Sequence, residues 1–381
     1  DHTAAIGKMH FYPWDIDEGF AERRIAEDKR HITLEDDYAQ ALKARGLRRQ
    51  HGSELQGYAE TKGAGLAGLP EDLFVDRWVA EETCAFLDRQ GTDKPFAAFV
   101  GFPSPHCPYD PTPEALEVLD TAGLLPPIAE TGDSKQLRQW MINGYSQAWA
   151  DLDLTELTDA QIDAIRRHYA ALIEMLDAEI GKVLDALAAS PHARNTVVIF
   201  ASDHGDFVGD YRMLGKSLFY EPSVRVPLVM ADLREAPAPR HRAEPVALQD
   251  LFPTLLDLAG CPPEPRPFYH SLREPGDPER AIAGITSHGV MLRQGRFKLT
   301  RYVNGVCQAF DLDADPKERS NLFDDPAVRP RVDAADRKLT AMMLEAMIRG
   351  QADKDINAAR AADKLGFSAR GWQRPYPAPA P

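Results

Sequence analysis

One short segment of the chain combines an acidic oxygen ligand with an imidazole. Asp203 and His204 are adjacent, and they follow directly on the apolar run at 196–201. Such a run, bounded by turn residues, is typical of a fully buried strand. Because ligands in open α/β sheets bind beyond the carboxyl ends of the strands, this pair is a candidate metal or anion site. Lys216 follows shortly after and adds a cation that can hold a charged oxygen.

Two other segments place basic side chains after expected strands. Lys8 and His10 follow a short strand expected at 3–7, and His106 lies in a proline-rich loop after a second buried strand expected at 96–102. Lysines suit oxyanions, and histidines exchange protons near neutral pH. These residues are therefore candidates for holding an anion.

Most of the candidates also have a purely structural alternative. Tyr12 and Tyr109 are candidates for lining a substrate pocket, but core packing explains an aromatic residue equally well. Cys107 beside His106 suggests a nucleophilic pair, yet sequence neighbours on an extended loop usually point apart. The remaining alternatives are a helix cap and turn for Asp203 and His204, surface positions for His10 and Lys216, a turn position for His106, and structural positions for Asp206, Asp210 and His168.

Composition narrows the class of protein. The chain has 381 residues, a net charge of −15 and 44% hydrophobic residues, which suits a large α/β domain with a smaller partner. A chain this acidic is a poor general binder of nucleic acid or anionic lipid. The four cysteines form no CxxC pair, and no apolar run is long enough to span a bilayer. No signal peptide is visible, so the compartment is not predicted.

The hydrophobic pattern predicts a mostly parallel sheet flanked by helices, followed by a smaller α+β lobe with an antiparallel sheet. The boundary is expected near the prolines around 265, giving domains 1–265 and 266–381. Residues 15–70 are expected to be a loop-rich insertion. A capping box at Thr158 and Gln161 predicts a long helix that ends near 190 and leads into a parallel strand at 196–201. The other expected elements are helices at 71–89, 248–259 and 328–349, a strand at 226–230, a meander at 289–293, 297–302 and 306–312, and a proline-rich tail at 374–381.

The order and spacing of these motifs closely resemble the sulfatase branch of the alkaline phosphatase superfamily, over nearly the whole chain. The matching segments are Gly7-Lys8-Met9-His10, Pro105-His106, Ser202-Asp203-His204-Gly205, Gly215-Lys216, Phe219-Tyr220-Glu221, residues 224–228, residues 250–256, and residues 310–318 with Asn321-Leu322.

The resemblance implies a metal-assisted hydrolase of sulfate or phosphate esters. Asp203 and His204 would be metal ligands, and Lys8 and His10 would contact the nucleophile and the transferred group. His106 and Lys216 would hold ester oxygens, with His106 as a candidate proton donor. The expected partner is a small anionic ester, and neither nucleic acid nor a membrane; homo-oligomerisation through the C-terminal helix and tail is also an expectation.

One departure from the family pattern concerns the nucleophile. The family makes a formylglycine from a C/S-x-P-x-R motif, and no such motif occurs in these residues. The family also places an aspartate pair for the metal on its first strand. We expect both in an N-terminal segment that precedes Asp1, on the same chain before processing or on a separate chain. The 381 residues alone are then expected not to turn over substrate.

The residue types of the expected metal ligands, Asp203 and His204, also indicate which metal and which substrates to expect. Calcium prefers oxygen ligands, whereas an imidazole such as that of His204 suits borderline transition metals, so one divalent ion, Mn²⁺ or Ca²⁺, is expected with manganese favoured. Relatives with Asp-His at this place include phosphonate monoester and phosphodiester hydrolases and choline-sulfatase-like enzymes, which widens the expected substrates. Two alternatives stay open: a two-zinc phosphodiesterase that uses late histidines, and an inactive binding or scaffold homologue.

Overall fold

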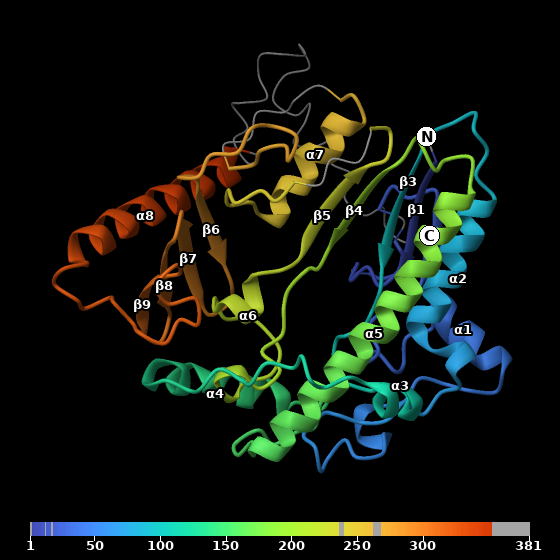
Figure 1. Ribbon diagram of the computed structural model, residues 1–381, viewed down its shortest axis with the longest axis horizontal. Coiled ribbons are helices and arrows are strands. Elements are labelled where there is room, and N and C mark those ends of the chain that lie inside the picture. The colour runs from blue at the N-terminus through green and yellow to red at the C-terminus, as the bar shows by residue number, and fades with distance from the viewer. Residues whose placement is uncertain (1, 12, 17, 236–239, 262–267, 353–381) are drawn as a thin grey trace. The chain divides into compact units, whose positions relative to one another are not determined.

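The computed structural model describes the chain except residues 1, 12, 17, 236–239, 262–267 and 353–381 (Figure 1). Its contacts divide the chain into two compact units, Asp1–Arg240 and His241–Pro381. The domain boundary expected near 265 falls among residues outside the described part and stays a prediction. The proline-rich tail at 374–381 lies outside it as well. None of the helices in the described part combines the length and hydropathy needed to cross a bilayer.

The first unit is built on a parallel sheet in the order β2-β1-β3. Strands β1 (His2–Gly7) and β3 (Phe96–Gly101) are paired in register along their whole length, and β2 (Glu22–Ile25) pairs with the other edge of β1. The strands expected at 3–7 and 96–102 are therefore confirmed. β2 was not expected, because its sequence Glu-Arg-Arg-Ile is charged and reads as loop. Since all three strands are parallel, the segments that follow them meet at one edge.

Helices α2 (Val75–Asp88) and α5 (Asp159–Ala189) pack along each other beside this sheet (Figure 1). The Thr158 hydroxyl accepts from the Gln161 amide and the Gln161 side chain accepts from the Thr158 amide, so the expected capping box is confirmed. One hydrophobic cluster joins the sheet to both helices through residues such as Ile6, Val79, Phe86 and Leu187. The other helices of this unit are α1 (Asp37–Ala44), α3 (Pro113–Val118), α4 (Gly132–Tyr145) and α6 (Glu221–Val224), with 3₁₀ turns at Gly52–Glu54, Glu71–Leu73 and Asp210–Arg212.

Strand β4 (Val197–Ala201) confirms the strand expected after the long helix, but its pairing differs from the expectation. Its described partner is β5 (Leu228–Asp232), and the two run antiparallel. The expectation of a parallel neighbour rested on a helix-to-strand connection. Such a connection favours a parallel strand but does not decide which strand lies next to it.

Burial of β3 and β4 is lower than their apolar sequences predict. In the described part of the chain each is paired along one edge only. Phe99 on β3 is 58% exposed, and Phe200 on β4 and Val229 on β5 are also exposed. The expectation of fully buried strands was therefore wrong for both. An apolar sequence shows that a strand is suited to burial. Whether the strand is buried depends on the elements that pack against it.

The second unit contains an antiparallel sheet in the order β6-β7-β8-β9. The expected meander is confirmed as β7 (Gly289–Gln294), β8 (Phe297–Tyr302) and β9 (Cys307–Asp311), and β6 (Ala281–Ile285) adds a strand that was not expected. Helix α8 (Arg329–Ala352) packs on the sheet through Val332, Ala335 and Leu339. Helix α7 (Leu251–Leu258) follows a 3₁₀ turn at Leu248–Asp250 and ends before Gly260 at φ +69°, as the sequence predicted.

Candidate active site

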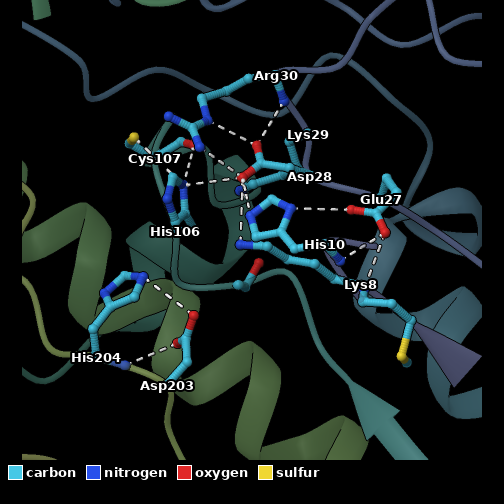
Figure 2. Close-up of polar contacts among 12 residues, drawn as sticks. Lys8, His10, Glu27, Asp28, Lys29, Arg30, His106, Cys107, Asp203 and His204 are labelled. Atoms are coloured by element: carbon cyan, nitrogen blue, oxygen red, sulfur yellow. Dashed lines mark hydrogen bonds and ion pairs between the residues drawn. The ribbon is translucent and has the colours of Figure 1, made fainter. Parts of the chain in front are cut away.

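The segments that follow β1, β2 and β3 bring basic side chains to one buried carboxylate. Lys8 and His10 follow β1, Asp28 follows β2, and His106 follows β3. Figure 2 shows Asp28 at the centre of this group. Its Oδ2 lies 3.3 Å from Lys8 Nζ, 3.7 Å from His10 Nε2 and 3.9 Å from His106 Nδ1. Three of the residues predicted from the sequence therefore meet at one atom of a fourth that the sequence did not single out.

Arg30 holds this carboxylate in place. Its Nε donates to Asp28 Oδ1 at 2.8 Å and its terminal nitrogen to Oδ2 at 2.9 Å, a bidentate pair. The guanidinium lies over the Trp149 ring, 4.4 Å from the ring centroid. Burial raises the pKa of Asp28, but the hydrogen bond from Arg30 and the neighbouring cations outweigh it and hold the pKa far below its usual range. Asp28 is thus a permanent, oriented negative charge.

Glu27 orients His10 in a similar way. Its Oε1 accepts from the amides of Met9 and His10, at 3.1 and 2.8 Å, and its Oε2 lies 3.2 Å from His10 Nδ1. His10 adopts φ +56°, a left-handed conformation that a residue with a Cβ rarely takes. Burial raises the pKa of Glu27, and the bonds from His10 and Met9 reverse the shift and lower it. The strained backbone is thus held by an ionised side chain.

His106 is largely enclosed, with its side chain 12% exposed, and it is neutral. Its Nδ1 lies 2.9 Å from the Cys107 carbonyl, which can only accept, so Nδ1 carries the proton and Nε2 presents a lone pair. Burial lowers the pKa of His106 to about 2. In this state His106 can accept a hydrogen bond at Nε2. It holds no proton for a leaving group until the charge around it changes.

The second part of the site follows β4. The Asp203 carboxylate is exposed, with its Oδ1 accepting from the His204 amide at 3.0 Å and its Oδ2 lying 3.3 Å from His204 Nε2. His204 Nδ1 donates to the Gly205 carbonyl at 2.7 Å, which leaves Nε2 as the acceptor for the Lys216 ammonium. Burial lowers the pKa values of both His204 and Lys216. The rings of His106 and His204 stand edge to face with centroids 5.8 Å apart, so the two parts of the site touch.

Asp206 and Tyr109 anchor the loop that carries Lys216. The Asp206 carboxylate accepts from the amides of Val208 and Gly215, both at 2.9 Å, and from the Tyr109 hydroxyl at 2.9 Å. Tyr109 is 0% exposed and belongs to the hydrophobic core. The structure therefore places Tyr109 behind the site, in the packing role that was the alternative to substrate contact. Tyr12, the other residue predicted to touch substrate, lies outside the described residues.

Comparison with known proteins shows the family to which this chain belongs. A family model described as "Sulfatase" matches residues 2–261, more than half of the chain. The chain belongs to the sulfatase family. Among curated relatives it is 27% identical to an arylsulfatase of Clostridium perfringens, over 92% of this chain and 77% of the relative. It is 29% identical to a choline-sulfatase of Rhizobium meliloti, over 85% of this chain and 65% of the relative.

Solved structures confirm the expected fold class. The chain superposes on a phosphonate monoester hydrolase of Agrobacterium radiobacter with a TM-score of 0.71 and 22% identity, covering 90% of this chain and 78% of that one. A phosphonate monoester hydrolase from Silicibacter pomeroyi gives a TM-score of 0.69 and 20% identity, covering 91% and 77%. Because both sequence identities are below 25%, these superpositions show only that the chain has the alkaline-phosphatase-like fold.

The metal expected of a sulfatase is only partly matched by the described residues. Asp203 offers an exposed carboxylate, and both it and an imidazole nitrogen suit a divalent ion. His204 Nε2 is unprotonated, but it accepts from the Lys216 ammonium in this structure and would exchange that bond for the metal. However, no group of three or more His, Cys, Asp or Glu ligands occurs in the described part of the chain. Divalent ions of this kind take at least four ligands. The donor types fit and their number does not, so the described residues by themselves do not form a complete metal centre.

Sequence reasoning missed Glu27, Asp28 and Arg30. They lie in the charged stretch at 15–70, where acidic residues are common and the sequence does not show which of them are enclosed. The feature that could have identified them is their position directly after a strand that pairs with β1. That element, β2, has no apolar alternation to mark it as a strand.

A close contact between β1 and β3 fixes Lys8, and it can be tested at Gly101. A Cβ built on Gly101 would lie 2.0 Å from the Lys8 carbonyl oxygen. We expect Gly101→Ala to separate the strand ends, to displace Lys8 and to destabilise the first unit by about 1–3 kcal/mol. Urea unfolding and amide exchange at Lys8 would measure both effects.

Gly181→Ala is the matched control for this substitution. It lies within α5, and a Cβ there meets nothing within 4 Å. The control should be neutral or stabilising by up to about 1 kcal/mol, because alanine favours a helix over glycine. Equal stability of the two variants would contradict the role given to the contact at Gly101.

Proposed function

We propose that this sulfatase chain provides the ester-binding residues and part of the metal site of a metal-dependent hydrolase of sulfate esters or phosphate and phosphonate esters. The observation that carries the proposal is the meeting of Lys8, His10 and His106 at Asp28, with His106 against His204. Family membership supports hydrolysis of such esters in general. The particular ester, the metal and the nucleophile belong to the proposal.

The proposed binding mode follows from charge and orientation. Lys8 and Lys216 bring ammonium groups to the two sides of the site, and each can hold an ester oxygen as a point charge. Cations that are already oriented stabilise charge developing on the transferred group, since no reorganisation is needed during reaction. His10, oriented by Glu27, adds an N–H donor toward the same group. His106 accepts a proton or a hydrogen bond at Nε2.

A divalent metal completes the proposed site. Asp203 and His204 would hold it together with ligands from outside the described residues, and when bound it would polarise an ester oxygen as a Lewis acid. The imidazole ligand favours manganese over calcium. The proposed nucleophile is a formylglycine. Since no C/S-x-P-x-R motif occurs in the 381 residues, it would come from residues outside them.

The proposal predicts a difference between two preparations. The 381 residues alone, verified by intact mass, should show no hydrolysis of 4-nitrophenyl sulfate or 4-nitrophenyl phenylphosphonate above background. The product of the complete reading frame, made together with the formylglycine-generating machinery, should hydrolyse at least one of them and lose that activity on chelation. Steady-state release of nitrophenol and elemental analysis of the same sample would check both expectations.

Each part of this proposal has its own contrary result. Hydrolysis by the 381 residues alone would show that the nucleophile lies within them. One equivalent of calcium without manganese would overturn the metal preference, and two equivalents of zinc would favour a two-zinc phosphodiesterase. If the product of the complete reading frame hydrolysed no sulfate, phosphate or phosphonate ester, that result would favour an inactive binding or scaffold homologue.

A further inference from the structure

The position of Asp28 carries an inference about which esters the site accepts. Its side chain is 1% exposed and makes a complete bidentate pair with Arg30. A carboxylate that served packing alone would need no further cation. Yet Oδ2, while bound to Arg30, also faces Lys8, His10 and His106 at 3.3 to 3.9 Å. One fixed negative charge is therefore shared among three side chains of the proposed ester site.

The fixed charges around the site offset one another. Lys8, Arg30 and Lys216 are cations, and Glu27, Asp28 and Asp203 are the carboxylates that touch the site residues. Asp28 lies between the Arg30 guanidinium and the Lys8 ammonium, so it offsets positive charge on the side of the site where Lys8 would meet an ester. Charges supplied from elsewhere, including a metal and its other ligands, would be common to any pair of variants that differ only at Asp28.

A site whose cations are already matched by carboxylates has less surplus attraction for a second negative charge. Sulfate esters and phosphonate monoesters carry one negative charge, whereas phosphate monoesters carry close to two above their second pKa of about 6. Asp28 lies among the cations that would face the ester, in a part of the protein that water reaches little. The interaction between charges is stronger there than in bulk solvent.

We propose that Asp28 is a positioning and specificity-determining residue of the ester site: it draws Lys8, His10 and His106 together and cancels one of their charges, so that the site favours singly charged esters over phosphate monoester dianions. This inference rests on the proposed function and goes beyond it, because it names the charge class of the substrate and the residue that selects it.

The experiment compares three esters with the same leaving group in the complete, metal-loaded enzyme at about pH 8. Two of them, 4-nitrophenyl sulfate and 4-nitrophenyl phenylphosphonate, are singly charged and differ in the central atom. The third, 4-nitrophenyl phosphate, is a dianion at this pH. Asp28→Asn should raise the ratio of kcat/KM for the phosphate to that for either singly charged ester by about tenfold or more. The ratio between the two singly charged esters should stay within about twofold, because they share one charge.

Asp250→Asn is the matched control. Asp250 is also buried and holds Arg280 in a bidentate pair, at 2.6 and 2.7 Å, but both residues belong to the second unit, whereas the site residues belong to the first. Its loss should lower the thermal transition and leave the substrate ratios unchanged. An unchanged ratio in folded Asp28→Asn, or an equal change in both variants, overturns the inference.

A second comparison covers the case in which Asp28→Asn does not fold. Removing Asp28 alone leaves Arg30 without its bidentate partner, whereas removing both members of a buried pair is tolerated better. The double variant Arg30→Met/Asp28→Asn is then compared with Arg30→Met. The phosphate ratio should again rise by about tenfold when Asp28 is lost, and an unchanged ratio again overturns the inference. If the unmodified enzyme hydrolyses none of the three esters, the proposed function itself has failed, which is a distinct result.

Discussion

Replacing Lys216 by alanine in the complete enzyme is expected to lower kcat/KM for its ester by about 10²–10³-fold. Lys216 is half-buried, its ammonium donates to His204 Nε2, and burial lowers its pKa. Its loop is closed by Asp206 through the Gly215 amide at 2.9 Å. A cation oriented in this way before substrate arrives can stabilise transition-state charge, and a water molecule in its place cannot supply the missing charge.

The same measurement includes a lysine that has no link to the site. Lys182 on α5 is exposed and pairs with Glu179 at 2.6 Å, so Lys182→Ala should leave kcat/KM unchanged. Lys216→Arg should recover little activity, because a planar guanidinium does not replace a compact ammonium. Metal content is measured in each sample, since Lys216 contacts His204. A Lys216→Ala enzyme with normal metal content and nearly full kcat/KM would rule out the proposed role.

Lys298→Met is expected to destabilise the second unit by about 3–5 kcal/mol. Lys298 on β8 and Glu318 are both 1% exposed, and Lys298 Nζ lies 2.8 Å from Glu318 Oε1. Removing one partner leaves an ionised group without compensation in a medium that solvates it poorly. The loss is comparable with the whole stability of many domains. Hydrogen exchange of the amides in β7, β8 and β9 would follow this unit directly.

Arg301 provides the comparison on the same strand. It pairs with Asp336 at 2.7 Å, but the two side chains are 49% and 38% exposed, so water screens this pair. Arg301→Met should therefore cost no more than about 1 kcal/mol. The double variant Lys298→Met/Glu318→Leu should recover part of the loss, since neither charge is then left alone. Similar losses for Lys298→Met and Arg301→Met would show that burial of the first pair has no energetic consequence.

The sequence predicted elements well where a local signal coincided with a long element. α5 is defined by a capping box and a sustained apolar stripe, and the meander of β7, β8 and β9 by short β-rich runs. It failed at β2, whose residues are charged and whose strand conformation depends on pairing with β1. The sequence also could not predict how deeply β3 and β4 are buried, because that depends on which other elements of the fold pack against them.

The candidate site was predicted in part for a related reason. Residues at the ends of apolar strands, such as Asp203 and His106, could be found because strand ends are where sites form. Asp28 could not, since its importance comes from three cations that reach it from different segments. Sequence spacing does not show which of many acidic residues will be enclosed. The sequence also could not show that burial keeps His106 neutral, with no proton on Nε2.

The one-sided pairing of β3 and β4 has a consequence for how this polypeptide behaves in a test tube. The peptide groups along an unpaired strand edge must bond to water or to another extended chain. With Phe99, Phe200 and Val229 beside them, these edges are templates for adding a strand from a neighbouring molecule. A lysine in place of the exposed Phe99 on β3 is therefore expected to reduce association of the isolated 381 residues at high concentration.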